Sequence, residues 1–352
     1  MAELIDYLKQ SVERKASDIF IVPGAPVCAK IDGALCPLDE NKIFPDVSLQ
    51  LISAAYEMAG RSMEKLRLRG DDDFSFAVPA CSRFRVSAYK QRGSYATVIR
   101  IVSFDVPDWK EQGIPEEVMK LADLNHGMVL VTGTAGSGKS TTEACIIDRI
   151  NRTRGCHIIT LEDPIEFLHR DVKSIVSQRE IAIDSEDYLS ALRACLRQAP
   201  DVIQVGEMRD AETVRAAMTA AETGHLLMAT LHTKGAVNSI DRIIDTFPAE
   251  QQYQVRVQLS MVLQTVVSQQ LLPDVNGGMV AAFEIMHMTS AIRSMIRDSK
   301  THQINNAITT GANDGMISMD QSILNLYKDG RISRQTALDY AFDPETVKRK
   351  IG

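Results

Sequence analysis

The residues best suited to chemistry form a glycine-rich loop that ends in a lysine and a serine. Residues 133–140 read Gly-Thr-Ala-Gly-Ser-Gly-Lys-Ser, a complete G-x-x-x-x-G-K-S pattern. In such a loop the backbone N–H groups surround a phosphate, the lysine reaches the β- and γ-phosphates, and the serine hydroxyl binds Mg²⁺. The pattern predicts a nucleoside triphosphate site, with Ser140 as a metal ligand, that is built from Gly133, Thr134, Ala135, Gly136, Ser137, Gly138, Lys139, Ser140 and Thr141.

The segments on either side of this loop favour the same interpretation. The apolar run Met128-Val-Leu-Val131 predicts a buried strand, and Thr141-Thr-Glu-Ala-Cys-Ile-Ile147 predicts the first turns of a helix. A strand, a glycine loop and a helix N-terminus in that order direct N–H groups toward an anion. The alternative is a glycine loop that matches by chance, and the correct context on both sides disfavours it.

Three further segments carry polar residues where predicted strands end, which is where open parallel sheets bind ligands. They are Leu161-Glu-Asp-Pro-Ile-Glu166, Asp201-Val-Ile-Gln-Val-Gly-Glu207, and the run from Gly224-His225 to His232. Phosphoryl transfer requires carboxylates for the metal and the attacking water, and cations for the developing charge. We therefore expect these segments to surround the phosphate loop.

Each of these segments also has a structural interpretation that stays open at this stage. Acidic turns are common on protein surfaces, and Gln204 interrupts the apolar run before Glu207. A histidine at a strand end is often packed or hydrogen-bonded, and most arginines are solvated. His225 and His232 lie seven positions apart without a third ligand, so we expect no histidine metal site.

The pattern along the chain predicts two domains. Residues 1–104 combine an amphipathic helix with alternating strands and an Asp32-Gly33 hairpin signal, which is typical of a small α/β unit. The stretch from Asp105 to Pro115 has two prolines and a glycine, and it predicts a linker over 105–114. Strands and helices then alternate from 115 to 352, as a parallel sheet requires. From about residue 250 we expect mainly helices, the first over 249–270.

Composition narrows the possible functions. The 352 residues are 45% hydrophobic and 24% charged, with a formal net charge of −7, which is typical of a globular protein and disfavours nucleic acid as the main partner. No apolar run is long enough to span a membrane. The six cysteines are scattered without a C-x-x-C pair, so we expect reduced thiols in a cytoplasm.

Taken together, the four motifs resemble the nucleotide-site motifs of the type II/type IV secretion ATPase superfamily. Ala291-Ile-Arg-Ser-Met-Ile-Arg-Asp298 resembles a helix signature of its pilus-retraction, PilT-like branch. The resemblance covers nearly the whole chain and is strongest from about 125 to 300. Two departures concern the branch: Gln198-Ala199 replace acids as in the PilU-like paralogue, and Ser17-Asp-Ile-Phe20 lacks a histidine.

This resemblance implies an α/β protein with a PAS-like N-terminal domain and a RecA-like P-loop ATPase domain. It implies a homo-hexamer that binds ATP and Mg²⁺ between the two domains. Beyond the loop, it assigns the following residues to the site: Glu166 as the general base, Glu207 beside Mg²⁺, His232 facing the phosphates with His225 as its companion, Arg85 and Arg100 closing on the γ-phosphate, and Arg193 and Arg197 as a further arginine pair.

The expected function is a motor that hydrolyses ATP to retract a type IV pilus, as in twitching motility. Its expected place is the cytoplasmic face of the inner membrane at the pilus base, held by a platform protein, because the chain has no membrane anchor. The alternatives are a PilU-like accessory subunit that depends on a partner motor and a filament-assembly or secretion ATPase. A nucleic-acid motor is disfavoured by the acidic charge balance.

Overall fold

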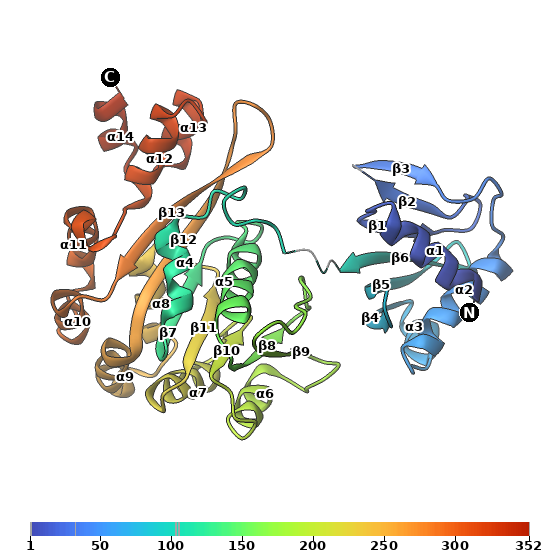
Figure 1. The fold of residues 1–352 in the computed structure, drawn as a ribbon, viewed down its shortest axis with the longest axis horizontal. Coiled ribbons are helices and arrows are strands. Elements are labelled where there is room, and N and C mark those ends of the chain that lie inside the picture. The colour runs from blue at the N-terminus through green and yellow to red at the C-terminus, as the bar shows by residue number, and fades with distance from the viewer. Residues whose placement is uncertain (1, 32, 103, 105, 352) are drawn as a thin grey trace. The chain divides into compact units, whose positions relative to one another are not determined.

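The computed structural model describes residues 2–31, 33–102, 104 and 106–351. The chain divides into two compact units (Figure 1). One consists of Met1–Asp105 with the short segment Glu166–Leu168, and the other of Val106–Ile165 with His169–Gly352. Asp105, which begins the predicted linker, and Asp32, from the predicted hairpin signal, lie outside the described residues.

The first unit is built on an antiparallel sheet of six strands in the order β3-β2-β1-β6-β5-β4. Alternate side chains of these strands, such as Phe84, Val86 and Ile99, are buried in one core with residues of the helices, and the intervening ones face the opposite side. The strands are β1 Asp18–Ile21, β2 Cys28–Ile31, β3 Ala34–Pro37, β4 Asp71–Val78, β5 Ser82–Gln91 and β6 Ser94–Val102, and the helices are α1 Ala2–Glu13, α2 Pro45–Met58 and α3 Glu64–Arg69.

The second unit is built on a seven-stranded sheet in the order β13-β12-β7-β11-β10-β8-β9. All neighbouring strands are parallel except β12 and β13, which are antiparallel. The strands are β7 Gly127–Thr132, β8 His157–Glu162, β9 Ile175–Glu180, β10 Val202–Val205, β11 Leu226–Leu231, β12 Leu263–Pro273 and β13 Met279–His287. Every residue of β7 and β11 is buried, which explains their continuous apolar sequences.

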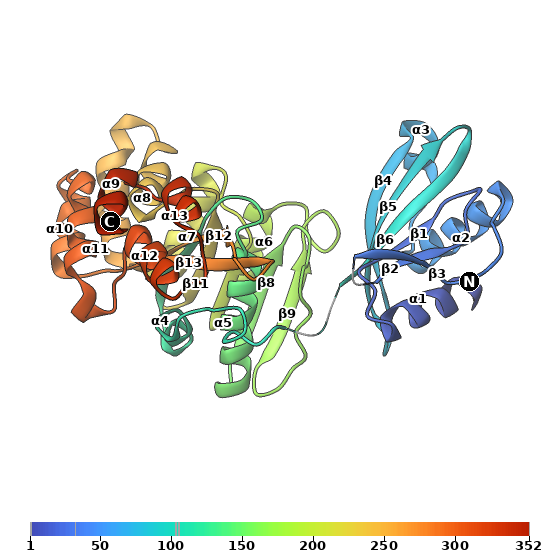
Figure 2. The same ribbon diagram turned by 90° about the horizontal axis from the view of Figure 1, so that it is seen from above.

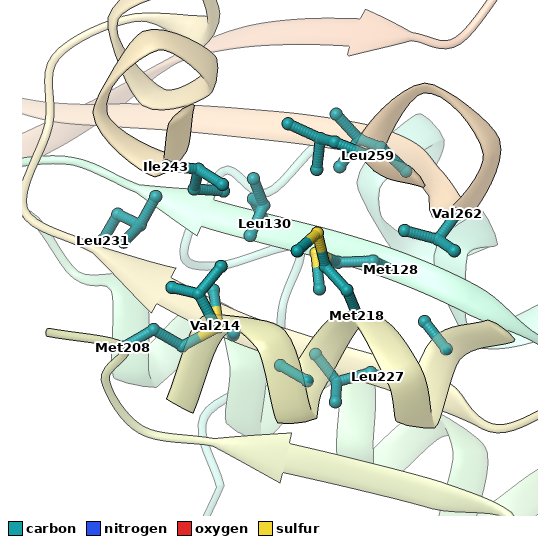
Figure 3. Close-up of a cluster of buried hydrophobic side chains, with 14 of the residues drawn as sticks. Met128, Leu130, Met208, Val214, Met218, Leu227, Leu231, Ile243, Leu259 and Val262 are labelled. Atoms are coloured by element: carbon teal, nitrogen blue, oxygen red, sulfur yellow. The ribbon is translucent and has the colours of Figure 1, made fainter. Parts of the chain in front are cut away.

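Helices cover both faces of this sheet. Figure 3 shows one face, where Met218 of a helix packs near Met128, Leu130 and Leu227 of the strands. The other face packs its core around Val129, Ile146 and Met228. The α-helices are α4 Glu116–Met119, α5 Lys139–Thr153, α6 Tyr188–Cys195, α7 Ala211–Glu222, α8 Ala236–Asp245, α9 Ala249–Val262, α10 Ser290–Arg297, α11 Ile304–Thr310, α12 Met319–Lys328, α13 Arg334–Tyr340 and α14 Pro344–Ile351, with short 3₁₀ turns at Lys120–Asp123, Thr301–Gln303 and Ala312–Asp314.

One predicted element is wrong. The helix expected over 249–270 ends at Val262, and the chain continues as strand β12, which pairs with β7 and β13. Nearly all of β12 is buried, and a buried apolar run cannot be assigned to a strand or a helix from periodicity alone. The region after residue 250 therefore contributes two strands to the sheet as well as helices. Within the described residues, no helix is long and apolar enough to cross a membrane.

Candidate nucleotide site

The phosphate loop joins the end of β7 to the start of α5, as the sequence predicts. Gly133 has φ 148° and Gly138 has φ 87°, both in the range that favours glycine. A Cβ atom on Gly133 would lie 2.4 Å from the carbonyl oxygen of Gln269, and one on Gly138 would lie 2.8 Å from Gln269 Nε2. Glycine is therefore required at both positions because the loop wraps closely around β12.

Lys139 lies under this loop and is only 7% exposed. Its Nζ atom donates to the carbonyl oxygens of Gly133 and Thr134, each at 3.0 Å. Within the described residues, the buried hydroxyls Thr132 Oγ1 and Ser137 Oγ have no hydrogen-bond partner. A buried hydroxyl without a partner is costly unless a ligand satisfies it, so this cradle fits a phosphate group.

Gln269 of β12 braces the loop and was not predicted. Thr142, one turn into α5, donates from Oγ1 to Gln269 Oε1 at 2.8 Å, and the Gln269 side chain is 3% exposed. Its amide nitrogen is the atom that a Cβ on Gly138 would meet. The only sequence signal for this role was a polar pair, Gln269-Gln270, inside an apolar run.

Three predicted residues come together beside the loop. His232 follows β11, and its Nδ1 atom lies 3.5 Å from Lys139 Nζ while its Nε2 atom lies 3.5 Å from Glu207 Oε1. Glu207 follows β10, the strand next to β11, and β11 is next to β7. The carboxyl ends of three adjacent parallel strands thus bring Lys139, His232 and Glu207 to one point.

The charge of Glu207 is set by its neighbours. Burial disfavours its ionised form, but the hydrogen bond from Arg209 and the charges of Arg209, His232 and Lys139 outweigh burial and lower the pKa of the carboxyl. Arg209 Nη2 lies 2.7 Å from Glu207 Oε2. Glu207 is therefore an anion at neutral pH, which suits a residue beside a metal cation.

The donor set here fits Mg²⁺. Ser140 offers a hydroxyl and Glu207 a carboxylate, and Mg²⁺ prefers oxygen ligands of this kind together with phosphate oxygens and water. No group of three or more His, Cys, Asp or Glu side chains in the described part of the chain could hold a metal ion by itself. The Ser140 hydroxyl and the Glu207 carboxylate therefore suit a metal ion that binds together with a nucleotide.

The acidic segment after β8 begins with an anchored residue. Glu162 Oε1 accepts hydrogen bonds from Thr160 Oγ1 at 2.6 Å and from Gln178 Nε2 at 3.1 Å. Glu166 is exposed and belongs to the short segment Glu166–Leu168 that groups with the first unit. Asp163 and Glu166 are thus the exposed acids of the segment after β8, and Glu162 is held by two hydrogen bonds.

Arg85 and Arg100 lie side by side in the first unit. They are directly opposite each other on β5 and β6, on the face of the sheet away from its core. Together with Asp18, Asp73, Ser87 and Val98 they line a depression of about 230 Å³, and Arg100 Nε donates to Asp18 Oδ1 at 3.0 Å. Arg100 is thus already paired with a carboxylate, and Arg85 lies on the same face of the sheet directly opposite it.

Three predicted residues are not brought to the loop of their own chain. His225 precedes β11, so it lies a strand length of ~20 Å from the end that carries His232, and its Nδ1 atom is 2.9 Å from Ala220 O. Arg193 Nη2 pairs with Glu212 Oε2 at 3.3 Å. Arg197 donates to the Arg193 carbonyl at 3.1 Å. None of these partners belongs to the phosphate loop.

Tyr188 is a second residue of the site that sequence reasoning missed. Its hydroxyl would lie 2.9 Å from a Cβ on Gly206, next to Glu207. Burial, followed by the charges of Asp163 and Glu207, raises the pKa of the phenol, so the hydroxyl stays protonated and able to donate. It opens α6 without any local motif that would mark it.

The chain is similar to known ATPases along nearly its whole length. Residues 2–314 match the family model described as Type II/IV secretion system protein, and the chain belongs to this family. It is 42% identical to the type IV pilus retraction ATPase PilT of Pseudomonas aeruginosa, over 97% of this chain and 99% of that protein.

Two further comparisons concern the branch of the family. A crystal structure of the pilus retraction motor PilT with bound ADP superposes with a TM-score of 0.89 at 43% identity, covering 98% of both chains. The type IV pilus ATPase PilU of Pseudomonas aeruginosa is 36% identical over 98% of this chain and 90% of that protein. The predicted family resemblance, the ATPase class and the fold class, an N-terminal domain with a RecA-like ATPase domain, are thereby confirmed.

Proposed function

We propose that this chain is an ATP-hydrolysing motor that powers retraction of a type IV pilus and works as a homo-hexamer. One observation carries the proposal: Lys139, His232 and Glu207 converge behind a complete phosphate loop, in a chain that is similar along its whole length to a retraction ATPase. The domains proposed for this motor are residues 1–104, a hinge over 105–114, and residues 115–352.

The residues of the site divide the chemistry between them. The loop N–H groups and Lys139 hold the triphosphate, and Glu166 accepts a proton from the water whose oxygen attacks the γ-phosphorus. The bond from that phosphorus to the bridging oxygen breaks, and ADP and phosphate leave. Ser140 and Glu207 would hold Mg²⁺, which offsets negative charge on the phosphates when it is bound.

The arginines supply the remaining positive charge. Arg85 and Arg100 form an adjacent cationic pair, which suits the γ-phosphate when the domains close about the hinge. Arg193, Arg197 and His225 lie away from the loop of their own chain, so their role in a hexamer is toward the nucleotide or the surface of a neighbouring subunit. Arginines supplied in this way by a second protein chain are common in phosphoryl transfer.

The proposed partners follow from the motor function. A platform protein of the inner membrane would receive the motion at the cytoplasmic face of the pilus base, and nucleic acid has no part in it. A second candidate function is the PilU-like accessory subunit, which Gln198-Ala199 favour, although the chain is 36% identical to PilU and 42% identical to PilT. Such a subunit would bind ATP but depend on a paralogous motor.

Steady-state MgATP hydrolysis by the purified chain, with its mass determined by light scattering, tests the proposal. A hexamer that turns over ATP without a partner supports the autonomous motor. A hexamer that binds ATP and scarcely hydrolyses it supports the accessory subunit instead. A monomer without turnover in the presence of MgATP contradicts both functions.

A further inference from the structure

Gln178 on β9 holds both ends of the acidic loop with one side chain. Its Nε2 atom donates to Glu162 Oε1 at 3.1 Å, and its Oε1 atom accepts from the backbone N–H of His169 at 2.8 Å. Glu162 is the last residue of β8, and His169 follows the loop over 163–168. The loop that carries Glu166 is therefore closed at its base by a single amide.

The chain beyond His169 is tied to the helix of the phosphate loop. Asn151, near the end of α5, donates from Nδ2 to Arg170 O at 2.7 Å and accepts at Oδ1 from Val172 N at 3.1 Å. The Asn151 side chain is 1% exposed. Figures 1 and 2 show α5, β8 and β9 side by side in both views. These bonds link the base of the acidic loop to the element that holds the phosphates.

We propose that Gln178 is a positioning residue for ATP hydrolysis, which fixes the loop over 163–168 so that Glu166 meets the attacking water. The inference rests on the proposed role of Glu166 as the general base. A general base must lie within hydrogen-bond reach of the proton that it removes. A displacement of about 1 Å can lower turnover by roughly 10²-fold.

The position demands an amide. A leucine would leave the His169 N–H without this acceptor and remove one donor to Glu162. A glutamate would place a carboxylate against Glu162, and Glu180 already lies opposite Glu162 on the neighbouring strand. A protonated carboxyl, in contrast, can donate with its hydroxyl and accept with its carbonyl, as an amide does.

The test compares Gln178→Leu and Gln178→Glu with the full-length wild type. Ser177→Ala is the matched control, because Ser177 Oγ bonds His157 Nε2 at 2.9 Å from the same strand without touching the loop. The measurements are kcat, the affinity for a fluorescent ATP analogue, and backbone hydrogen exchange over 163–169. A thermal melt reports whether each variant is folded.

We expect Gln178→Leu to lower kcat by roughly 10- to 100-fold while nucleotide affinity changes by less than about 3-fold. Exchange over 163–169 should become faster in this variant, and Ser177→Ala should resemble the wild type in every measurement. The turnover of Gln178→Glu relative to wild type should recover as pH falls from about 8 to about 6, because the new carboxyl then takes up a proton.

Wild-type kcat and exchange in Gln178→Leu would overturn the inference. If Gln178→Leu does not fold, the Gln178→Glu variant provides the test. Turnover of that variant that does not recover at low pH, relative to the wild type, would also overturn the inference. The proposed role of Glu166 is tested separately. Wild-type turnover in Glu166→Gln would show that Glu166 is not the general base, whereas the hydrogen-exchange data still report whether Gln178 holds the loop.

Discussion

The Nε2 atom of His232 lies 3.5 Å from the Oε1 atom of Glu207. On its other side, His232 Nδ1 lies 3.5 Å from the ammonium of Lys139. An ammonium group only donates hydrogen bonds, so Nδ1 must be the acceptor and Nε2 must carry the proton that points at Glu207. His232 therefore connects the lysine of the phosphate loop to the carboxylate of Glu207.

Replacing His232 by alanine should break this connection. We expect kcat of His232→Ala to fall by roughly 10- to 100-fold, because a polarising group beside the phosphates is lost. The control is His302→Ala, an exposed histidine outside the proposed site, which should keep the wild-type kcat. Steady-state kinetics compare the kcat of the two variants directly, and a wild-type kcat in His232→Ala would contradict the arrangement.

The loop glycines should differ from one another. In Gly133→Ala the new Cβ would lie 2.4 Å from a backbone oxygen, so the loop must shift and ATP affinity should fall by at least about 10-fold. In Gly136→Ala nothing lies within 4 Å, and only the backbone strain at φ 74°, about 1 kcal/mol, opposes the change. Isothermal titration with ATP measures both, and a weaker effect at Gly133 would contradict the packing against Gln269.

The positions of several site residues could be predicted because these residues follow buried strands, and such strands appear in the sequence as apolar runs. Glu207 and His232 stand just after such runs, Lys139 ends the glycine loop that follows another, and parallel strands bring such positions together. His225 precedes its strand, so the direction of the strand takes it away from the loop of its own chain, and its role stays a proposal. For Arg193 and Arg197, no local feature of the sequence tells whether the side chain forms an ion pair at the surface or contacts a phosphate.

The residues that brace the site could not be predicted because their partners are remote in sequence. Gln269 supports Thr142 across 127 positions, and it lies in a buried strand whose sequence also fits a helix. Gln178 acts through a backbone N–H of His169, which no side-chain motif records. Local patterns thus predicted which groups gather beside the phosphate loop but not the contacts that hold them.

His169 should make the stability of the protein depend on pH. Its Nδ1 atom is buried, and burial lowers the pKa of the imidazole to about 4. The unfolded chain, with a pKa near 6.5, then binds a proton that the folded chain does not, so stability is complete above pH ~6.5 and falls toward pH ~4. The loss is at most about 3 kcal/mol.

A His169→Leu variant should lack this part of the pH dependence. Urea unfolding at several pH values measures it in both proteins. An unchanged slope between about pH 6.5 and pH 4 in the variant would show that other groups cause the acid sensitivity.

Glu284 should be essential for the packing of the loop after His232. Glu284 is 3% exposed, and its carboxylate accepts from Ala236 N at 2.7 Å and from Met319 N at 3.3 Å, the first residues of α8 and α12. Glu284→Ala leaves two buried N–H groups without acceptors, at a cost of about 2–5 kcal/mol. Chemical unfolding measures the loss, and the exposed Glu250→Ala should change stability by less than about 0.5 kcal/mol.

Glu284→Gln should be milder and should respond to pH. Burial raises the pKa of Glu284, against the opposing effect of the two backbone hydrogen bonds. A raised pKa in the folded state gives a contribution that is present at low pH and is lost as pH rises through that value. The stability of Glu284→Gln relative to wild type should therefore improve with increasing pH, and the opposite trend would contradict this account.

The most direct test of the central claim is single-turnover MgATP hydrolysis by Glu166→Gln beside the wild type. The account predicts that the variant binds ATP with wild-type affinity and keeps its assembly state. Its hydrolysis should be slower by roughly 10²- to 10⁴-fold, the usual contribution of a general base. Hydrolysis by Glu166→Gln at the wild-type rate would contradict the account, because the only exposed glutamate of the Glu162–Glu166 segment would then have no part in the reaction.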